Sequence, residues 1–155
     1  LEHGSCTFII VTDRAISQEI VRHRLASYFQ ESTRYCNYAN GKFAREITVI
    51  ESSGLAENEA REWLNLMEMS ERTYLHQIDA GVKPEKARDV LPLCLKTELM
   101  MTANFREWRH FLKLRGSRMA HPEIRKIANQ IYQIFQQAIP VLVEDIEIFD
   151  DDAAE

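Results

Sequence analysis

The sequence has 155 residues, enough for one domain with a sizeable core, and it is 45% apolar and 28% charged, as in ordinary soluble globular proteins. No apolar run reaches the length that crosses a bilayer, so we expect no membrane partner. The net charge is −5, and seven of the 24 acidic residues lie in the last twelve positions, so the preceding part of the chain is slightly basic. Arg outnumbers Lys by 13 to 6, a bias that fits phosphate contacts and equally fits an ordinary surface.

Cysteine and histidine usage points away from disulfides and metals. Cys6, Cys36 and Cys94 are odd in number and widely spaced, which indicates free thiols in a reducing compartment, and we expect the cytoplasm. The five histidines show no ligand pair at helical spacing, so no metal site is expected.

The chain is expected to open with a strand over residues 6–12, which are mostly β-branched or aromatic. Asp13 then serves as the N-cap of a helix that carries Arg22 and His23. Apolar side chains form one arc of this helix: Ile16, Ile20, Val21, Leu25 and Tyr28. Arg24 falls within the arc, where an unpaired charge is costly. The alternatives are that the helix ends near Arg24 or that the stem of Arg24 lies along the core edge.

The middle of the chain predicts a loop, a strand and a long helix. Residues 29–45 are polar and aromatic with a turn signal at Asn40-Gly41, and are expected to form an active-site loop, with or without a short hairpin in it. Residues 47–50 look like a strand. An amphipathic pattern over 57–80 predicts a long helix, which Gly81 ends.

After that helix, Pro84 is expected to open a short helix that carries Arg88 and ends at Leu91-Pro92. Residues 93–102 fit either extended chain or helix. Residues 104–114 predict a helix whose buried stripe is Phe105, Trp108, Phe111 and Leu112, opposite a basic face of Arg106, Arg109, His110 and Lys113.

The C-terminal part predicts one more helix and a tail. Pro122 and Glu123 open the last long helix, which Pro140 ends. Residues 144–155 are acidic and are expected to be a mobile tail behind a single domain that covers residues 1–143.

Basic side chains cluster in Arg22-His23-Arg24, which is followed by seven residues and then Ser32. Arg grips phosphate with a planar fork of donors, so this cluster suits an anionic ligand. The spacing resembles the signature of the flavin-dependent thymidylate synthases. Further blocks in the family's order carry the resemblance over most of the chain: Arg34-Tyr35, Ala87 to Pro92, Thr97 to Asn104, His110 to Arg115 and Ala120 to Arg125.

The resemblance implies an α+β fold, a sheet flanked by long helices, assembled as a homotetramer with shared active sites. It implies methylation of deoxyuridine monophosphate (dUMP) to thymidine monophosphate (dTMP). Methylenetetrahydrofolate gives the carbon and NADPH reduces a bound FAD, which then gives the hydride. Family members carry a further segment ahead of the position that Leu1 matches, so we expect the N-terminal part of the family domain to be missing here.

The resemblance also assigns roles residue by residue. Flavin contacts are expected from Arg22, His23, Arg24, Asn104, Arg106 and His110. Contacts to dUMP are expected from Glu19, Arg22, Gln30, Glu31, Ser32, Thr33, Arg34, Arg88 and Arg115. Arg88 would come from a neighbouring subunit, and the Ser32 hydroxyl would face the phosphate. Because the sequence places no dedicated base beside Ser32, a binding role is favoured over a nucleophilic one.

Arg115 matches the family residue that polarises the uracil ring. Hydride is nucleophilic, so a guanidinium beside the ring stabilises the charge that develops there. The alternative is that Arg115 only complements the dipole at a helix end. Glu19 stands where many members have Gln, and a carboxylate beside phosphate is repulsive unless it is paired. Arg22 and His23, three and four residues further on, are its expected partners.

Two other functions stay open at this point. An Arg-rich nucleic-acid-binding module would use Arg22, Arg24, Arg34, Arg106 and Arg109. The negative net charge and the lack of a Lys-rich stripe count against it, so no nucleic acid partner is expected. The second alternative is a truncated relative that assembles without catalysis.

Overall fold

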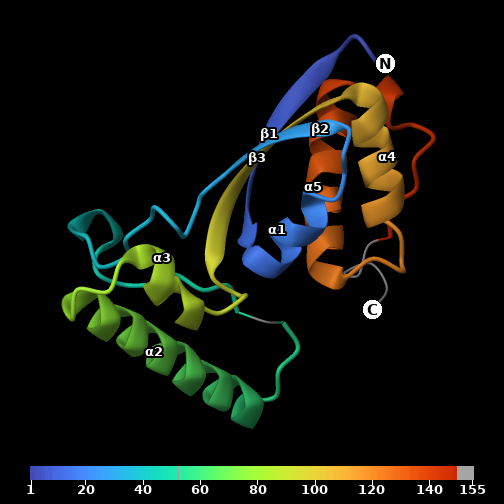
Figure 1. Cartoon of the computed structure of the whole chain (residues 1–155). Helices are drawn as coiled ribbons and strands as arrows, with labels where there is room; N and C mark the ends of the chain where they lie inside the picture. The colour runs from blue at the N-terminus through green and yellow to red at the C-terminus, as the bar shows by residue number, and fades with distance from the viewer. Residues whose placement is uncertain (52, 150–155) are drawn as a thin grey trace. The chain divides into compact units, whose positions relative to one another are not determined.

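The computed structural model describes residues 1–51 and 53–149, and these form an α+β fold with a three-stranded antiparallel sheet (Figure 1). The strands are β1 (Ser5–Asp13), β2 (Ala26–Gln30) and β3 (Lys96–Asn104), in the order β1-β3-β2. The helices are α1 (Arg14–Ile20), α2 (Glu57–Asp79), α3 (Pro84–Ala87), α4 (Phe105–Arg115) and α5 (Pro122–Ala138). Short 3-10 helices cover Gly41–Phe43, Arg88–Val90 and Pro140–Leu142. The predicted α+β class is confirmed.

β3 is the central strand, and its side chains alternate between buried and more open positions. The buried ones are Thr97, Leu99, Met101 and Ala103. A period of two is the pattern that a pleated strand imposes. The segment 93–102, which fitted strand or helix from sequence, is therefore strand from Lys96 onward.

The chain divides into two compact units. Unit 1 consists of residues 1–10, 18–29 and 100–155, and unit 2 consists of residues 11–17 and 30–99. Arg22, His23 and Arg24 belong to unit 1, whereas Ser32 and Arg88 belong to unit 2.

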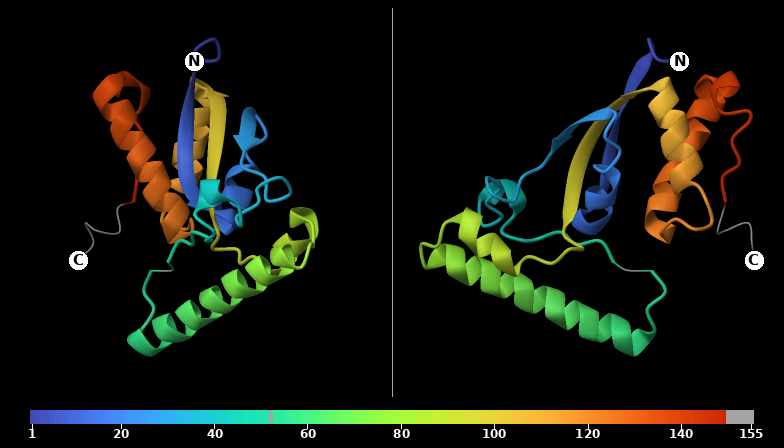
Figure 2. Two further views of the ribbon diagram at one scale, coloured as in Figure 1. Left: turned by 90° about the vertical axis from the view of Figure 1, so that its left-hand side faces the viewer. Right: turned by 45° about the vertical axis from the view of Figure 1, so that its right-hand side comes forward.

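The core of unit 1 lies around Trp108, which is fully buried. α4 and α5 pack against each other and lie side by side in both views of Figure 2. The ring of Phe8 makes edge contacts with Trp108 and Phe135, at centroid distances of 4.9 and 5.4 Å. The indole N–H of Trp108 donates to the Cys6 carbonyl at 3.2 Å. These contacts place α4, and with it Arg106, His110 and Arg115, on a rigid support.

Helices α4 and α5 confirm the amphipathic patterns predicted over 104–114 and from Pro122 to Pro140. Asn104 is the N-cap of α4, because its side-chain oxygen accepts from the Glu107 N–H at 2.9 Å. Pro122 occupies the first turn of α5, as expected of a residue without an N–H.

Unit 2 has a smaller core of Tyr38, Tyr74, Ala87 and Leu95, to which α2 contributes Tyr74. α2 confirms the predicted long helix, and Gly81 follows it with a φ of 86°, the left-handed conformation expected after a helix end. The predicted strand at 47–50 is reduced to one isolated bridge between Val49 and Leu95. The backbone N–H of Ile47 donates to the Glu71 carboxylate at 2.8 Å, so it is not available for a ladder.

The first helix ends earlier than its apolar pattern predicts. α1 stops at Ile20, so the expectation that it carries Arg22 and His23 is wrong. The hydroxyl of Tyr28 lies 3.0 Å from the Ile20 carbonyl and 2.6 Å from the His23 carbonyl, which fixes the turn after the helix. Of the two alternatives left open by the sequence, a helix that ends near Arg24 is the better description, although the helix ends four residues before Arg24. Asp13 is the predicted cap, since its carboxylate accepts from the Ile16 N–H at 2.7 Å.

Two further expectations concern the segment before β3 and the tail. The helix expected between Pro84 and Leu91 is split into α3 and a 3-10 helix that carries Arg88.

Within the expected acidic tail, Ile146 is buried and the Phe149 N–H donates to the Gly116 carbonyl at 2.8 Å. Residues 150–155 of that tail lie outside the described residues. Among the helices described, none combines the length and apolar character of a bilayer span.

Candidate functional site

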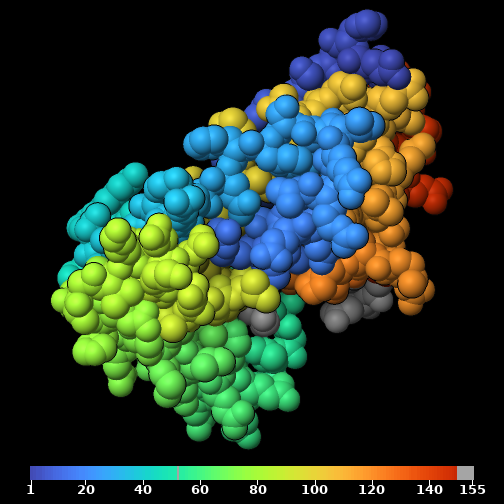
Figure 3. Space-filling view, in the orientation of Figure 1, coloured from blue at the N-terminus to red at the C-terminus, as the bar shows by residue number. Residues whose placement is uncertain are grey.

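Unit 1 contains a cavity of about 950 Å³ between the turn that follows α1 and the exposed side of α4. The turn contributes residues 22–25, α4 contributes Arg106, Glu107, His110, Leu114 and Arg115, and the α4–α5 connection contributes Ser117, Met119 and Ala120. In Figure 3 the blue atoms of the turn lie against the gold and orange atoms of α4. Four guanidinium groups and one carboxylate line the cavity, so its walls favour an anionic ligand.

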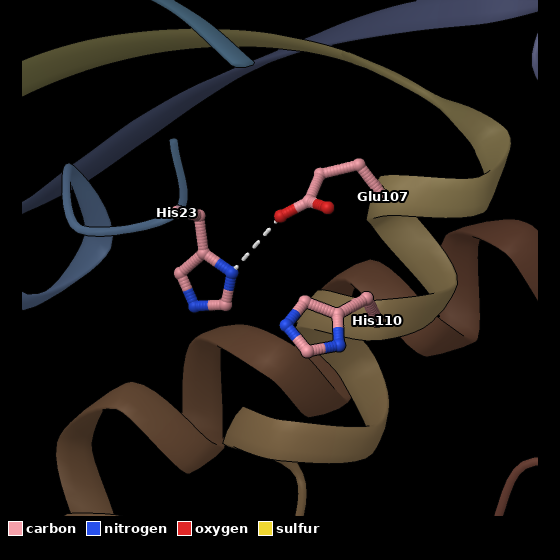
Figure 4. A group of neighbouring side chains, drawn as sticks. All are labelled: His23, Glu107 and His110. Atoms are coloured by element: carbon pink, nitrogen blue, oxygen red, sulfur yellow. Dashed lines mark hydrogen bonds and ion pairs between the residues drawn. The ribbon is translucent and has the colours of Figure 1, made fainter. Parts of the chain in front are cut away.

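His23 is the most enclosed polar side chain of this cavity, with 4% of its surface exposed. Its Nδ1 lies 3.3 Å from Oε1 of Glu107, which is also buried (Figure 4). Its Nε2 accepts a hydrogen bond from Nε of Arg115 at 3.1 Å. Burial lowers the pKa of His23, the Arg115 cation lowers it further, and Glu107 partly opposes both. The imidazole is therefore neutral at neutral pH.

Arg115 ends α4, and three contacts hold its guanidinium. Besides the bond to His23, Nη1 donates to the Glu19 carboxylate at 2.9 Å and Nη2 donates to the Glu19 carbonyl at 3.1 Å. The side chain keeps 17% of its surface exposed, so it still reaches the cavity. The partner of Glu19 is thus Arg115, 96 residues along the chain, instead of Arg22 or His23. The helical spacing behind that expectation does not apply, because α1 ends at Ile20.

Of the other residues predicted to contact flavin, four line the cavity and one, Asn104, does not. Arg22, Arg24, Arg106 and His110 line the cavity with exposed side chains. Arg106 also forms an exposed ion pair with Glu2, with Nε and Oε1 2.7 Å apart, which contributes little in water. Asn104 is not among the lining residues, and its side-chain oxygen caps α4.

Most of the predicted dUMP contacts in unit 2 lie within residues 30–34. Gln30 donates to the hydroxyls of Ser17 and Thr97, at 2.8 and 3.3 Å, so its amide is engaged inside the unit. The Ser32 hydroxyl is exposed and accepts from the Arg34 N–H at 3.4 Å. This group leaves Ser32 open to a ligand while Gln30 holds the start of the loop.

Thr33 is buried, whereas Arg34 and Arg88 are exposed. Arg34 pairs with Glu85 of α3 at 3.6 Å, which links the loop to the segment that leads into Arg88. Glu31 lies in a smaller cavity of unit 2, about 260 Å³, together with Lys42 and Lys96. Glu46 lines the same cavity, and Lys96 pairs with the carboxylate of Glu98 at 2.5 Å.

His23, Glu107 and His110 form a group whose possible metal-ligand atoms all lie within 4.8 Å of one another. The spacing of the histidines in sequence did not indicate it, because His23 and Glu107 are 84 residues apart. Both ring nitrogens of His23 already have hydrogen-bond partners, and four arginines line the same cavity. Metal binding would have to displace one of those bonds beside several positive charges, so His23 and Glu107 are better explained as a hydrogen-bonded pair with the His110 ring beside it.

Glu107 is the functional candidate that sequence reasoning missed. It is 5% exposed and lies one turn before Phe111 on the buried side of α4. A carboxylate within an apolar stripe is costly unless it is paired, so its position in the stripe was the available signal. What could not be read from the sequence was the partner, His23.

The chain matches the family model described as "Thymidylate synthase complementing protein" over residues 1–141. It is 41% identical over 130 residues to a protein of Thermococcus onnurineus named "Flavin-dependent thymidylate synthase", covering 83% of this chain and 53% of that protein. Proteins with the same name from Geobacter sulfurreducens and Mycolicibacterium vanbaalenii are 36% and 31% identical, over 94% and 96% of this chain. The chain spans 62% and 64% of those two proteins. It therefore corresponds to between about half and two thirds of each of these three relatives.

Proposed function

Because the chain belongs to the family of thymidylate synthase complementing proteins, we propose that it carries the catalytic machinery of a flavin-dependent thymidylate synthase. The reaction is methylation of dUMP to dTMP, with methylenetetrahydrofolate as carbon donor, FAD as cofactor and NADPH as reductant. The observation that carries the proposal is the unit 1 cavity, in which Arg22, Arg24, Arg106 and Arg115 converge around a buried, neutral His23.

The residues of the cavity fit FAD. Its volume of about 950 Å³ lies at the upper end of small-molecule sites, as an extended cofactor requires. Exposed guanidinium groups at Arg22, Arg24 and Arg106 suit its two phosphates, since Arg binds phosphate with paired hydrogen bonds. Apolar side chains at Leu25, Leu114 and Met119 suit a flat aromatic ring. When bound and reduced, the flavin supplies the hydride.

Arg115 has the properties of the residue that activates the uracil ring. Its guanidinium is fixed by three contacts before any ligand arrives, and two of its five N–H groups are left over for a ligand. A fixed cation lowers the energy of charge that develops on the ring, without reorganisation during the reaction. The rival role at the helix dipole would not require bonds to Glu19 and His23.

The phosphate-binding part of the dUMP site is assigned to the unit 2 group. The exposed Ser32 hydroxyl and the exposed Arg34 and Arg88 guanidinium groups are donors that suit a monophosphate. In this proposal Arg88 acts on the site of a neighbouring subunit, and the protein works as the homotetramer that the family resemblance implies, with the family fold of a sheet flanked by long helices. It acts on small molecules in the cytoplasm and takes no nucleic acid.

The nucleic-acid-binding alternative is not favoured. Of its five arginines, Arg106 pairs with Glu2 and Arg34 pairs with Glu85. Arg109 donates to the Asp145 carboxylate at 2.6 Å and to the Leu142 carbonyl. Arg22 and Arg24 face a cavity, whereas a duplex requires an open basic surface.

The test is formation of dTMP from dUMP by the purified chain with FAD, NADPH and methylenetetrahydrofolate. Product that requires every component supports the proposal. A chain that binds FAD and dUMP yet forms no dTMP, while a longer relative does so under the same conditions, would assign the chain to assembly or binding alone.

A further inference from the structure

Four side chains of unit 1 form one hydrogen-bonded series in the wall of the cavity. Glu107 contacts Nδ1 of His23 at 3.3 Å, Nε2 of His23 accepts from Nε of Arg115 at 3.1 Å, and Arg115 donates to the Glu19 carboxylate at 2.9 Å. Figure 4 draws the contact between the first two members, Glu107 and His23, and both of these side chains are buried. None of the assignments drawn from the family's motifs gives Glu107 a role.

The direction of each hydrogen bond follows from the chemistry of Arg115. A guanidinium is always protonated and offers only donors. Nε2 of His23 must therefore carry a lone pair, and the single proton of the neutral ring must be on Nδ1. That proton points at Oε1 of Glu107, which accepts it. The opposite tautomer would place two N–H groups against each other between His23 and Arg115.

We propose that Glu107 is a positioning residue that acts through His23, selecting the Nδ1–H tautomer so that His23 and Glu19 together fix the guanidinium of Arg115. The proposal rests on the proposed function, in which Arg115 stabilises charge on the uracil ring. Three of the five N–H groups of Arg115 are engaged by this series, so its plane cannot rotate without breaking bonds. A carboxylate that orients an imidazole is a recurring device for holding a ring in one tautomer.

Two variants of Glu107 test this positioning role by separating the hydrogen bond that Glu107 accepts from the charge that it carries. Glu107→Gln keeps a side-chain oxygen that accepts from Nδ1–H, whereas Glu107→Leu keeps similar volume and removes the acceptor. Glu57→Leu is the matched control, because Glu57 is an exposed helical glutamate that pairs with Arg61 at 3.3 Å. Because a misplaced catalytic group can cost about a hundredfold, Glu107→Leu is expected to lower kcat by about that factor and to leave KM for dUMP within about threefold. Glu107→Gln and Glu57→Leu should stay within about tenfold of the original rate.

A second measurement does not depend on turnover. Nitrogen NMR shifts of the labelled chain report which nitrogen of His23 holds the proton, and hydrogen exchange of the Arg115 Nε–H reports whether that bond persists. The proposal expects Nδ1–H in the unmodified chain and in Glu107→Gln, and loss of Arg115 Nε–H protection in Glu107→Leu. Nε2–H in the unmodified chain would overturn it, even if Glu107→Leu fails to fold.

The two proposals fail in different ways. An unmodified chain that forms no dTMP but shows the expected tautomer and exchange pattern contradicts the proposed function and leaves the positioning role of Glu107 standing. An active chain in which Glu107→Leu keeps its kcat contradicts the positioning role and leaves the function standing.

Discussion

Replacement of Arg115 separates a catalytic role from a helix-end role. Arg115→Ala removes three hydrogen bonds, to His23, to the Glu19 carboxylate and to the Glu19 carbonyl. Arg115→Lys restores the charge, but a single ammonium group cannot reproduce the planar fork that meets three acceptors. Lys113→Ala is the matched control, because Lys113 also lies in the last turn of α4 and pairs with Asp145 at 3.4 Å.

The size of the effect can be worked from the contacts. A hydrogen bond that involves a charged group contributes about 1.5–3 kcal/mol when it is well buried. Glu19 keeps 37% of its side-chain surface exposed, so solvent screens the ion pair between Glu19 and Arg115. We therefore expect Arg115→Ala to lower the free energy of unfolding by about 1–2 kcal/mol in total. Lys113→Ala should have little effect on the free energy of unfolding, since both side chains of its ion pair are exposed.

The assay is dTMP formation at saturating dUMP, together with urea unfolding and FAD binding for each variant. If Arg115 stabilises charge in the transition state, Arg115→Ala lowers turnover by roughly a hundredfold or more and Arg115→Lys recovers little of it. Near-normal turnover in both variants, with only the stability loss, would refute the reasoning and return Arg115 to a structural role.

Three further outcomes are expected. Ser32→Ala should weaken dUMP binding by calorimetry while measurable turnover persists, and a trapped covalent adduct on Ser32 would contradict this. Asn104→Ala should lower the free energy of unfolding by about 1 kcal/mol, since it removes the N-cap of α4. Burial holds the pKa of His23 below its ordinary value of 6.5, so the unfolded chain takes up a proton first as pH falls. Stability should therefore drop as pH falls below about 6.5, and His23→Gln should flatten that part of the urea-unfolding profile.

Sequence patterns were sufficient to predict the three long helices, whose apolar spacing and end residues lie within or next to the helix itself. The helices over 57–79, 105–115 and 122–138 follow from apolar residues at three- and four-residue steps, with Gly81, Asn104 and Pro122 at their ends. The segment before Asn104 could not be decided, because its strand conformation depends on pairing with β1 and β2, which are distant in sequence.

Long-range contacts decided what the sequence could not. α1 ends at Ile20, whose carbonyl accepts from the Tyr28 hydroxyl, and the apolar arc through Val21 and Leu25 gave no sign of this end. Arg22, His23 and Arg24 were singled out from their spacing, and the cavity brings them together with Arg106, His110 and Arg115. The partners of His23 and Glu19 lie 84 and 96 residues away, beyond any spacing rule.

The central claim is that the unit 1 cavity binds a flavin through its arginines, and an equilibrium titration of the chain with FAD, followed by flavin fluorescence, tests it most directly. Arg24→Glu reverses a charge that lines the cavity, whereas Arg61→Glu reverses an exposed charge on α2 in unit 2. We predict saturable binding that Arg24→Glu weakens by at least about tenfold, equivalent to about 1.4 kcal/mol, and that Arg61→Glu leaves nearly unchanged. Equal losses in both variants, or no saturable binding by a folded chain, would contradict the claim.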